Sequence, residues 1–234
     1  MENSQARANI LPTSILASMK IENASGLILR TRPLTETSLI VHWLTPGLGR
    51  VATVAKGARR PKSPFAGKLD LFYAADFSFS RSRRSELHNL REVKLHGTHG
   101  AIREDIVKLQ QAAYAANLLE QATETETPLP EIFELVRGFL KALCEQKPSP
   151  QNIFALELKL LHELGLAPDL ATARLTPGAK KIVAALLAAD WNTSARLHLS
   201  RTQSAELHEW LHGFLIVHLG RLPRGRAAAL AAGG

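Results

Sequence analysis

Three histidines and one glutamate near the C-terminus have the spacing of a zinc peptidase site. In His208-Glu209-x-x-His212, two imidazoles lie one helical turn apart, and the carboxylate between them can deprotonate a metal-bound water. A third histidine, His218, follows six residues later. Taken alone, this pattern indicates zinc-dependent peptide hydrolysis.

The residues around this motif do not complete a metal site. Zinc peptidases that use a third histidine need glycine at the seventh position after the first, where this chain has Leu215. Both methionines, Met1 and Met19, precede the motif, so no methionine turn follows it. We therefore expect no metal. The segment is interpreted as a helix in which His218 packs in the core and the other two histidines lie at its boundary.

A second group of residues has the chemistry to bind phosphate. The stretch KGARRPKSPFAGK, residues 56–68, contains five cations and no acid: Lys56, Arg59, Arg60, Lys62 and Lys68. Its glycines and prolines predict a surface loop, beside which a polyanion backbone can lie. Gly67-Lys68 is not followed by Ser or Thr, so the stretch is not a phosphate-binding P-loop and no ATP site is expected. The alternative is a solvated basic loop without a ligand.

Further arginines extend this candidate set. The nucleic-acid contacts expected outside the loop are Arg30, Arg32, Arg50, Arg81, Arg83 and Arg84. A possible secondary contact comes from Arg221, Arg224 and Arg226 in GRLPRGR, which follows the last predicted helix. These three side chains either bind phosphate or cap carbonyl groups at the helix end.

The net charge of +8 is concentrated in the first part of the chain. Residues 1–98 contain 15 Lys and Arg against 7 Asp and Glu, whereas residues 99–234 contain 14 of each. This asymmetry predicts a polyanion-binding module followed by a neutral one.

The hydrophobic pattern places these cations on two kinds of structure. Alternating and β-branched runs predict five strands, at residues 26–32, 37–44, 50–56, 70–80 and 86–97. Five short strands without an intervening long helix favour a small closed antiparallel barrel. Tyr73, Phe77 and Phe79 share one face of the fourth strand, where they either stack bases or, as we favour, fill the core.

After residue 100 the apolar residues repeat at three and four positions, which predicts a bundle of about five helices, the last at 203–220. The predicted organisation is a flexible extension (1–22), a barrel (23–98), a helical domain (99–226) and a flexible tail (227–234). The single cysteine, Cys144, excludes a disulfide within the chain and a cysteine-based zinc site. No secretory signal is recognised, so a cytoplasmic location is expected.

The chain resembles the RecO family of bacterial recombination mediators. The similarity begins in GLILRTRPLTETSLIVHWLTPGLGRVATVAKGARRPKS and continues through ELHNLREV, LELKLLHELGLAPDL, LTPGAKKIVAALL and HLGRLPRGR. It covers residues 26 to 226, and the order and spacing of the motifs are more specific than any one of them.

The resemblance implies an α+β chain, with an N-terminal OB-fold followed by an α-helical domain. It also implies a non-enzymatic protein of DNA repair that binds single- and double-stranded DNA and anneals complementary strands. The implied partners are RecR, RecF and single-stranded-DNA-binding protein, with help in loading RecA. Many members carry a four-cysteine zinc element, which this chain lacks, so no cofactor is expected. An OB-fold RNA-binding protein and the zinc peptidase are the alternative interpretations.

Overall fold

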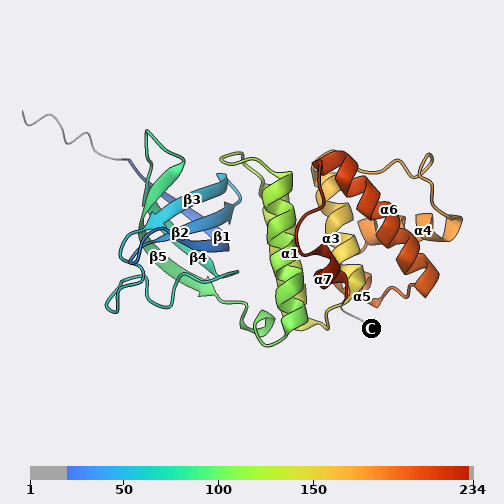
Figure 1. Ribbon diagram of the computed structural model, residues 1–234, viewed down its shortest axis with the longest axis horizontal. Helices are drawn as coiled ribbons and strands as arrows, with labels where there is room; N and C mark the ends of the chain where they lie inside the picture. Colours follow the sequence, from blue (N-terminus) through green and yellow to red (C-terminus); the bar gives the residue numbers. More distant parts are fainter. Residues whose placement is uncertain (1–19, 232–234) are drawn as a thin grey trace, which may run out of the picture.

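The computed structural model describes residues 20–231, which form a β-barrel followed by a layered group of helices (Figure 1). Residues 1–19 and 232–234 are outside this range, so most of the expected N-terminal extension lies outside the described residues. Within that expected extension, Ile21 and Glu22 already belong to the first strand. The predicted fold class, a barrel followed by helices, is confirmed.

Five strands close the barrel in the order β1-β2-β3-β5-β4. Their bounds are β1 Ile21–Pro33, β2 Leu39–Thr45, β3 Gly49–Ala55, β4 Ala74–Ser80 and β5 Leu87–Gly97. The turn at residues 46–48 joins β2 to β3 as a hairpin, where the Pro-Gly sequence predicts one.

One pair of strands corrects the expectation of a wholly antiparallel barrel. β3 and β5 run parallel, with Ala52 opposite Leu87 and Val54 opposite Asn89, whereas the other neighbouring pairs are antiparallel. The physical reason is geometric: an odd number of strands cannot alternate direction all the way around a closed ring. The long connection between β3 and β4, residues 56–73, carries the chain to the far side of β5 and makes this parallel pair possible.

The barrel interior is filled by inward-facing side chains, which alternate with outward-facing ones along each strand. Trp43 and Phe77 stack with ring centroids 4.0 Å apart, and Phe79 follows Phe77 at 5.8 Å. The Trp43 indole nitrogen donates to Thr53 Oγ1 at 2.9 Å, so the polar atom of this buried ring is satisfied.

The sequence pattern predicts that the fourth strand begins at residue 70, but β4 begins at Ala74 and residues 70–73 lie outside it. Phe72 has a left-handed backbone (φ 64°), and its side chain is buried in the helical core instead of the barrel. The backbone of Ile28 forms two hydrogen bonds with this segment. Its carbonyl accepts from Phe72 N at 2.7 Å, and its N–H donates to the Tyr73 carbonyl at 2.9 Å. The chain therefore turns at this point to tie the barrel to the helices.

Between the barrel and residue 231, the structure describes seven α-helices and a short 3-10 turn, η1 (Gly100–Ile102). Their bounds are α1 Ile106–Ala122, α2 Pro130–Glu145, α3 Pro150–Glu163, α4 Pro177–Ala188, α5 Trp191–Arg196, α6 Arg201–Leu219 and α7 Arg226–Leu230. Five were predicted, and the two short helices α5 and α7 were missed. Among the described residues, no helix has the length and apolar character needed to cross a membrane.

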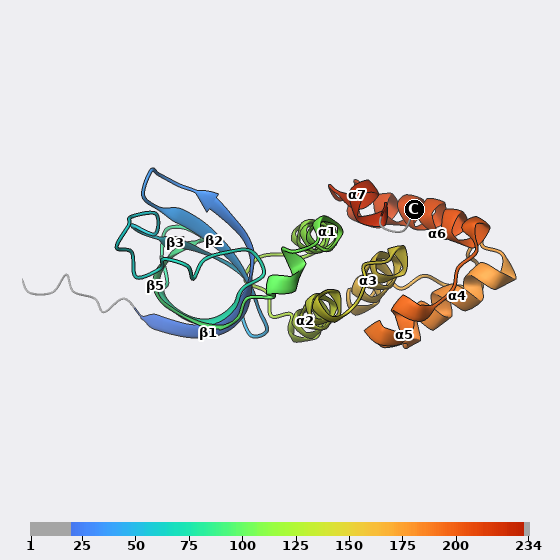
Figure 2. The ribbon, with the colours of Figure 1, turned by 90° about the horizontal axis from the view of Figure 1, so that it is seen from below.

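The C-terminal segment is a correction to the expected flexible tail. Residues 226–230 form α7, and Ala229 is fully buried against the bundle. Gln111 of α1 donates to the Ala229 carbonyl at 3.0 Å. The alanines of this segment led to the expectation of a flexible tail. In the structure, their small side chains allow α7 to approach α1 closely (Figure 2).

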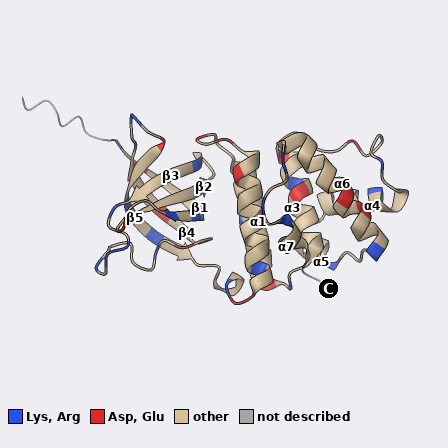
Figure 3. Cartoon of the chain, viewed as in Figure 1, with Lys and Arg blue, Asp and Glu red and all other residues tan. Residues whose placement is uncertain are grey.

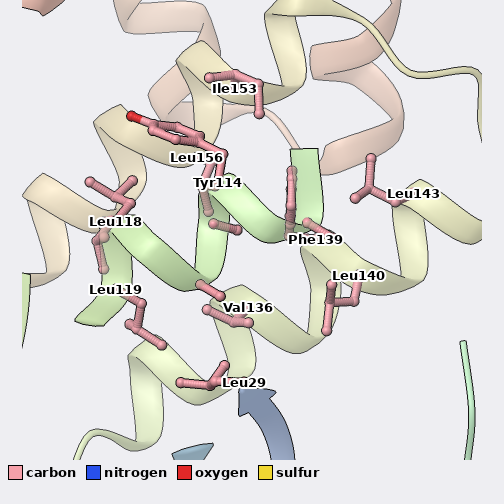
Figure 4. Close-up of a cluster of buried hydrophobic side chains, with 14 of the residues drawn as sticks. Leu29, Tyr114, Leu118, Leu119, Val136, Phe139, Leu140, Leu143, Ile153 and Leu156 are labelled. Atoms are coloured by element: carbon pink, nitrogen blue, oxygen red, sulfur yellow. The ribbon is translucent and has the colours of Figure 1, made fainter. Parts of the chain in front are cut away.

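A second apolar cluster, separate from the barrel interior, joins the barrel to the helices. Leu29 of β1 lies among Leu119 and Val136 of the first two helices, as Figure 4 shows. Gly49 lies against the α1–α2 loop so closely that a Cβ built there would be 1.8 Å from the Thr127 carbonyl oxygen. These contacts hold the outer face of the barrel and the first helix in a fixed relationship.

Candidate nucleic-acid interface

The basic loop, residues 56–68, lies on the surface of the barrel, and Figure 3 shows cations spread along the barrel loops. Its four most exposed cations are Lys56, Arg59, Arg60 and Lys62, whereas Lys68 is half-buried. The loop is anchored by Phe65, which is buried in the barrel core. Within the described residues, none of its cations forms an ion pair with a carboxylate, so their charge faces solvent.

The basic loop is attached to the β1–β2 turn. Arg59 donates its backbone N–H to the Thr37 carbonyl at 3.0 Å, and its Nη1 lies 3.4 Å from the Thr35 carbonyl. Arg32 lies two residues before this turn begins, near the end of β1. The loop is therefore adjacent to the strand end that carries the next cation of the candidate set.

A second basic surface lies where the outer face of β1, β2 and β3 meets α1 and the segment after α6. We call this cavity of about 480 Å³ the junction groove. Its lining residues are Arg30, Arg32, His42, Arg50, Asn117, Glu120, Gln121, Arg221, Leu222 and Arg224. Five of these ten side chains are arginines and one is a carboxylate. The groove brings together candidate residues from both ends of the sequence.

Arg30 is held by α1 on one wall of the junction groove. Its Nε and Nη2 atoms donate to Glu120 Oε1 and Oε2 at 2.9 and 2.6 Å, in a two-pronged ion pair. Nη2 also donates to Asn117 Oδ1 at 2.6 Å. A guanidinium group binds a carboxylate or a phosphate with the same fork of N–H groups. Arg30 is therefore positioned for anion binding, but the Glu120 carboxylate already occupies its guanidinium group.

Arg50 is tied to the C-terminal end of α1. It donates to the Oγ1 atom and the carbonyl oxygen of Thr123, at 2.9 and 2.5 Å. Burial lowers the pKa of Arg50, partly offset by the charge of Glu120, although a guanidinium group remains protonated at neutral pH. Arg50 thus supplies fixed positive charge at the base of the groove.

The segment after α6 places two further arginines on the rim of the groove. Gly220 ends α6 in a left-handed conformation (φ 75°), which turns the chain back toward α1. Gln121 Nε2 donates to the Arg221 carbonyl at 2.6 Å, and Asn117 Nδ2 donates to the Arg224 carbonyl at 3.1 Å. These bonds fix the backbone and leave both guanidinium groups exposed.

Three guanidinium groups of the groove carry no competing anion. Among the residues that the structure describes, the side chains of Arg32, Arg221 and Arg224 have neither a hydrogen bond nor an ion pair, and all three are exposed. Arg32 comes from the barrel, and the other two come from the C-terminal part. An anion that entered the groove would therefore meet free cations on both walls.

His42 also lines the groove, and sequence reasoning did not select it. Burial lowers the pKa of His42, and the charges of the neighbouring arginines lower it further, whereas Glu120 opposes this shift. The imidazole is therefore neutral at pH 7 and can donate a hydrogen bond without adding charge. Glu120, Asn117 and Gln121 were missed as well. Their spacing on one face of α1 is visible in the sequence, but the groove opposite that face is not.

The structure gives Arg81 a different environment from Arg83 and Arg84, the other two arginines of this segment. Arg81 pairs with Glu22 at 2.9 Å and with Glu126 at 2.7 Å, so its charge joins the barrel to the α1–α2 loop. His88 supports this link through Nε2 to Glu126 Oε1 at 2.7 Å. The structure gives Arg81 this structural role, and its contact with DNA stays a prediction. Arg83 and Arg84 remain exposed on the β4–β5 turn.

Arg226 is a correction to the candidate set of secondary contacts. Its side chain is buried and forms an ion pair with Glu157, Nε to Oε1 at 2.7 Å. A guanidinium group that is removed from solvent and already paired is not available to a phosphate. The spacing of GRLPRGR does not distinguish it from its exposed neighbours, because the turn at Gly225 (φ 89°) decides which side chain points inward.

The histidine motif lies on α6 without the geometry of a zinc site. The His208 and His212 rings are 6.2 Å apart and half-buried, as expected for boundary residues. His218 is exposed and lies against Phe214 at 4.2 Å, so its predicted place in the core is wrong. The helix continues beyond the motif to Leu219, and Ile216 and Val217 in this last part are exposed. Within residues 20–231, no group of three or more His, Cys, Asp or Glu side chains is placed to hold a metal.

The aromatic residues of the fourth strand belong to the core. Phe77 and Phe79 are buried inside the barrel, as the favoured interpretation predicts, and they present no face to a base. Tyr73 is half-buried, with the Arg103 guanidinium over its ring at 4.8 Å. The candidate interface is therefore built from cations, and stacking residues contribute little to it.

Two family models match this chain in succession. One is described as recombination protein O, N terminal, and matches residues 19–99; the other, recombination protein O, C terminal, matches residues 103–173. The junction between them falls between the end of β5 and the start of α1, where the barrel gives way to helices.

Curated relatives named DNA repair protein RecO are similar over the same region. The relative from Exiguobacterium sibiricum is 33% identical over 150 residues, which cover 64% of this chain and 59% of the relative. The relative from Bacillus subtilis is 32% identical over 150 residues, covering 64% and 58%. The relative from Anaeromyxobacter sp. (strain K) is 33% identical over 146 residues, covering 62% and 58%. The match thus spans less than two thirds of each relative's length.

Proposed function

Because this chain belongs to the RecO family of recombination proteins, we propose that it is a DNA-binding recombination mediator that acts in DNA repair. The observation that carries this proposal is the presence of exposed, unpaired cations both on the basic loop and in the junction groove. The basic loop and the junction groove are joined through the β1–β2 turn, and only one carboxylate lines the groove. Such a surface attracts a phosphate backbone without reading base sequence.

The proposed mechanism is charge neutralisation. When a DNA strand binds, its phosphates are neutralised by Lys56, Arg59, Arg60 and Lys62. The strand then releases its condensed counterions, and this release is the main source of affinity. A strand whose backbone charge is neutralised is repelled less by a complementary strand, so pairing is accelerated. No step in this mechanism needs a general acid, base or nucleophile, and the protein acts as a binding partner instead of an enzyme.

The proposed partners are those of the family. Single- and double-stranded DNA bind the basic surface, and RecR, with RecF, works with the protein to load RecA onto DNA coated by single-stranded-DNA-binding protein. Burial of Phe77 and Phe79 supports backbone recognition over base stacking, because these rings are not accessible. Lys68, Arg83 and Arg84 extend the proposed contact at its edges.

The test is binding of the full chain to a labelled single-stranded oligonucleotide across a salt series, with annealing of complementary strands measured in the same samples. We expect affinity to fall steeply as salt rises and annealing to be faster than without protein. Tight, salt-insensitive binding would contradict backbone recognition. An RNA oligonucleotide of the same sequence, used as competitor, distinguishes DNA from RNA as the preferred polymer.

A further inference from the structure

The junction groove contains a carboxylate in the position where an incoming phosphate would be most favourable. Glu120 occupies the fork of Arg30 with two hydrogen bonds of 2.9 and 2.6 Å. It is the one acid among the lining residues, and its charge also acts on His42 and Arg50. A carboxylate held by an arginine fork has the same contacts that a phosphodiester group makes.

We propose that the junction groove is a phosphate-binding site of its own, separate from the basic loop, and that Glu120 sets its affinity by occupying Arg30 when no strand is bound. This inference rests on the proposed function, since the phosphate belongs to the strand that the basic surface attracts. In this site, Arg32 binds the phosphate from the barrel, while Arg221 and Arg224 bind it from the segment after α6.

The chemistry of the lining selects phosphate over other anions. Leu222 is the one aliphatic side chain among the ten that line the groove, so an acidic peptide would find little apolar surface for its own side chains. A phosphate chain needs only charge and hydrogen-bond donors, which Arg32, His42, Arg221 and Arg224 supply. Arg32, which lines the groove, lies two residues before the β1–β2 turn that bonds to the basic loop, so one DNA strand can continue from the loop into the groove.

The side-chain hydrogen bonds of Asn117 make the site depend on both domains. Its Oδ1 atom accepts from Arg30 of the barrel at 2.6 Å, and its Nδ2 atom donates to the Arg224 carbonyl at 3.1 Å. The two walls are therefore positioned by one side chain of α1. Release of Arg30 from Glu120 would leave its guanidinium next to Asn117, within the same groove.

The experiment compares variants of the full chain by fluorescence anisotropy with a labelled 20-nucleotide oligothymidylate across a salt series. Each phosphate contact to a single strand contributes about 0.7 to the slope of log affinity against log salt. We expect Arg32→Ala/Arg224→Ala to make the slope shallower by about 1.4 and to weaken binding on the order of tenfold at 0.1 M salt. Glu120→Gln should steepen the slope by about 0.7 and tighten binding several-fold, because Arg30 is released.

Matched controls separate this site from net charge. Glu124→Gln removes the same charge from an exposed residue that does not line the groove, and Arg174→Ala/Lys181→Ala removes two exposed cations elsewhere. Equal effects of Glu120→Gln and Glu124→Gln, or of the two arginine pairs, would overturn the inference. Displacement of the oligonucleotide by hexaglutamate as effectively as by an unlabelled strand would overturn the assignment to phosphate.

The two proposals fail in different ways. If the native protein binds no oligonucleotide, the proposed function fails and this inference falls with it. If the native protein binds with a steep salt dependence but the groove variants behave like their controls, the inference alone is wrong. Thermal unfolding of the variants at exposed sites is expected to match the native protein. Glu120 is half-buried and paired with Arg30, so binding of Glu120→Gln is measured at a temperature where its unfolding curve shows a fully folded protein.

Discussion

Arg226, the first residue of α7, and Glu157, in the middle of α3, form a buried ion pair with both prongs of the guanidinium group in use. The Nε–Oε1 and Nη2–Oε2 distances are 2.7 and 2.9 Å. Tyr114 of α1 donates its hydroxyl to the same carboxylate at 2.5 Å. Burial and then the charge of Glu157 raise the pKa of Tyr114 well above its ordinary value. The C-terminal segment is thereby fixed to two helices.

Loss of Arg226 should destabilise the protein strongly. Arg226→Ala leaves the Glu157 carboxylate buried without its partner, and we expect the free energy of unfolding to fall by about 3–5 kcal/mol. Arg226→Met/Glu157→Leu should lose much less, because neither residue leaves a buried charge. Denaturant unfolding followed by circular dichroism measures both, with the exposed Arg224→Ala as control. A loss below about 1 kcal/mol for Arg226→Ala would show that the pair is not essential.

The basic loop should contribute to DNA affinity and not to stability. Arg59→Ala/Arg60→Ala/Lys62→Ala removes three exposed cations, so the salt slope for a single-stranded oligonucleotide should become shallower by about 2. The melting temperature should change little, because no cation of the loop forms an ion pair within the described residues. Lys147→Ala/Arg174→Ala/Lys181→Ala, with the same charge change in the helical domain, is the control. Equal slopes in the two triple variants would exclude the loop as a specific contact.

His42 should make both stability and binding depend on pH. Its folded pKa lies below the ordinary value of 6.5, mainly because of burial, so its protonation opposes folding. Stability is therefore unaffected by His42 above about pH 6.5 and decreases as the pH falls below that value. His42→Gln should remove part of this decrease between pH 7.5 and 5.5, measured by denaturant unfolding.

A phosphate in the junction groove would favour the protonated imidazole of His42. Oligonucleotide affinity should consequently rise as the pH falls from 7.5 to 5.5, and His42→Gln should flatten this rise. Anisotropy titrations at both pH values measure the effect at constant ionic strength. An unchanged pH dependence in His42→Gln would place the bound phosphate away from this side chain.

Gly49 should tolerate no side chain. Its φ of 66° is left-handed, and a Cβ would lie 1.8 Å from the Thr127 carbonyl oxygen, a backbone atom that cannot move aside. We expect Gly49→Ala to cost about 1–3 kcal/mol in stability. Gly47→Ala, two residues earlier in the same turn, has open space around its Cβ and should be nearly neutral. Similar melting temperatures for the two variants would contradict the close packing of barrel and helices.

The histidine motif on α6 should hold no stoichiometric zinc. His218 is exposed against Phe214, away from the other two histidines, so a third ligand is not in place. Metal analysis of the purified chain, dialysed against zinc and then against buffer, measures bound metal. Glu209→Ala should leave folding and oligonucleotide binding unchanged, since its side chain is exposed. One equivalent of zinc that His208→Ala or His212→Ala removed would revive the peptidase interpretation.

Local sequence pattern was sufficient for most of the architecture. Alternation along residues 37–44 and 50–56 identified two strands, and Pro46-Gly47 identified their turn, because these signals depend on neighbouring residues alone. The helices at Pro130 and Pro177 follow from apolar periodicity and N-terminal proline. The short helix α7 was missed because its stability comes from burial of Ala229 and Arg226 and not from its own propensity.

The candidate site divides in the same way. The exposed basic loop follows from local sequence, since glycine, proline and lysine at residues 56–62 exclude regular structure and burial. Folding is what places Arg30 and Arg224 in one groove, pairs Arg81 and Arg226 with carboxylates, and brings Glu120 to the cations. Charge and spacing are local properties of a chain, whereas the partner of each guanidinium group depends on segments that are about 45 to 90 residues apart and that only folding brings into contact.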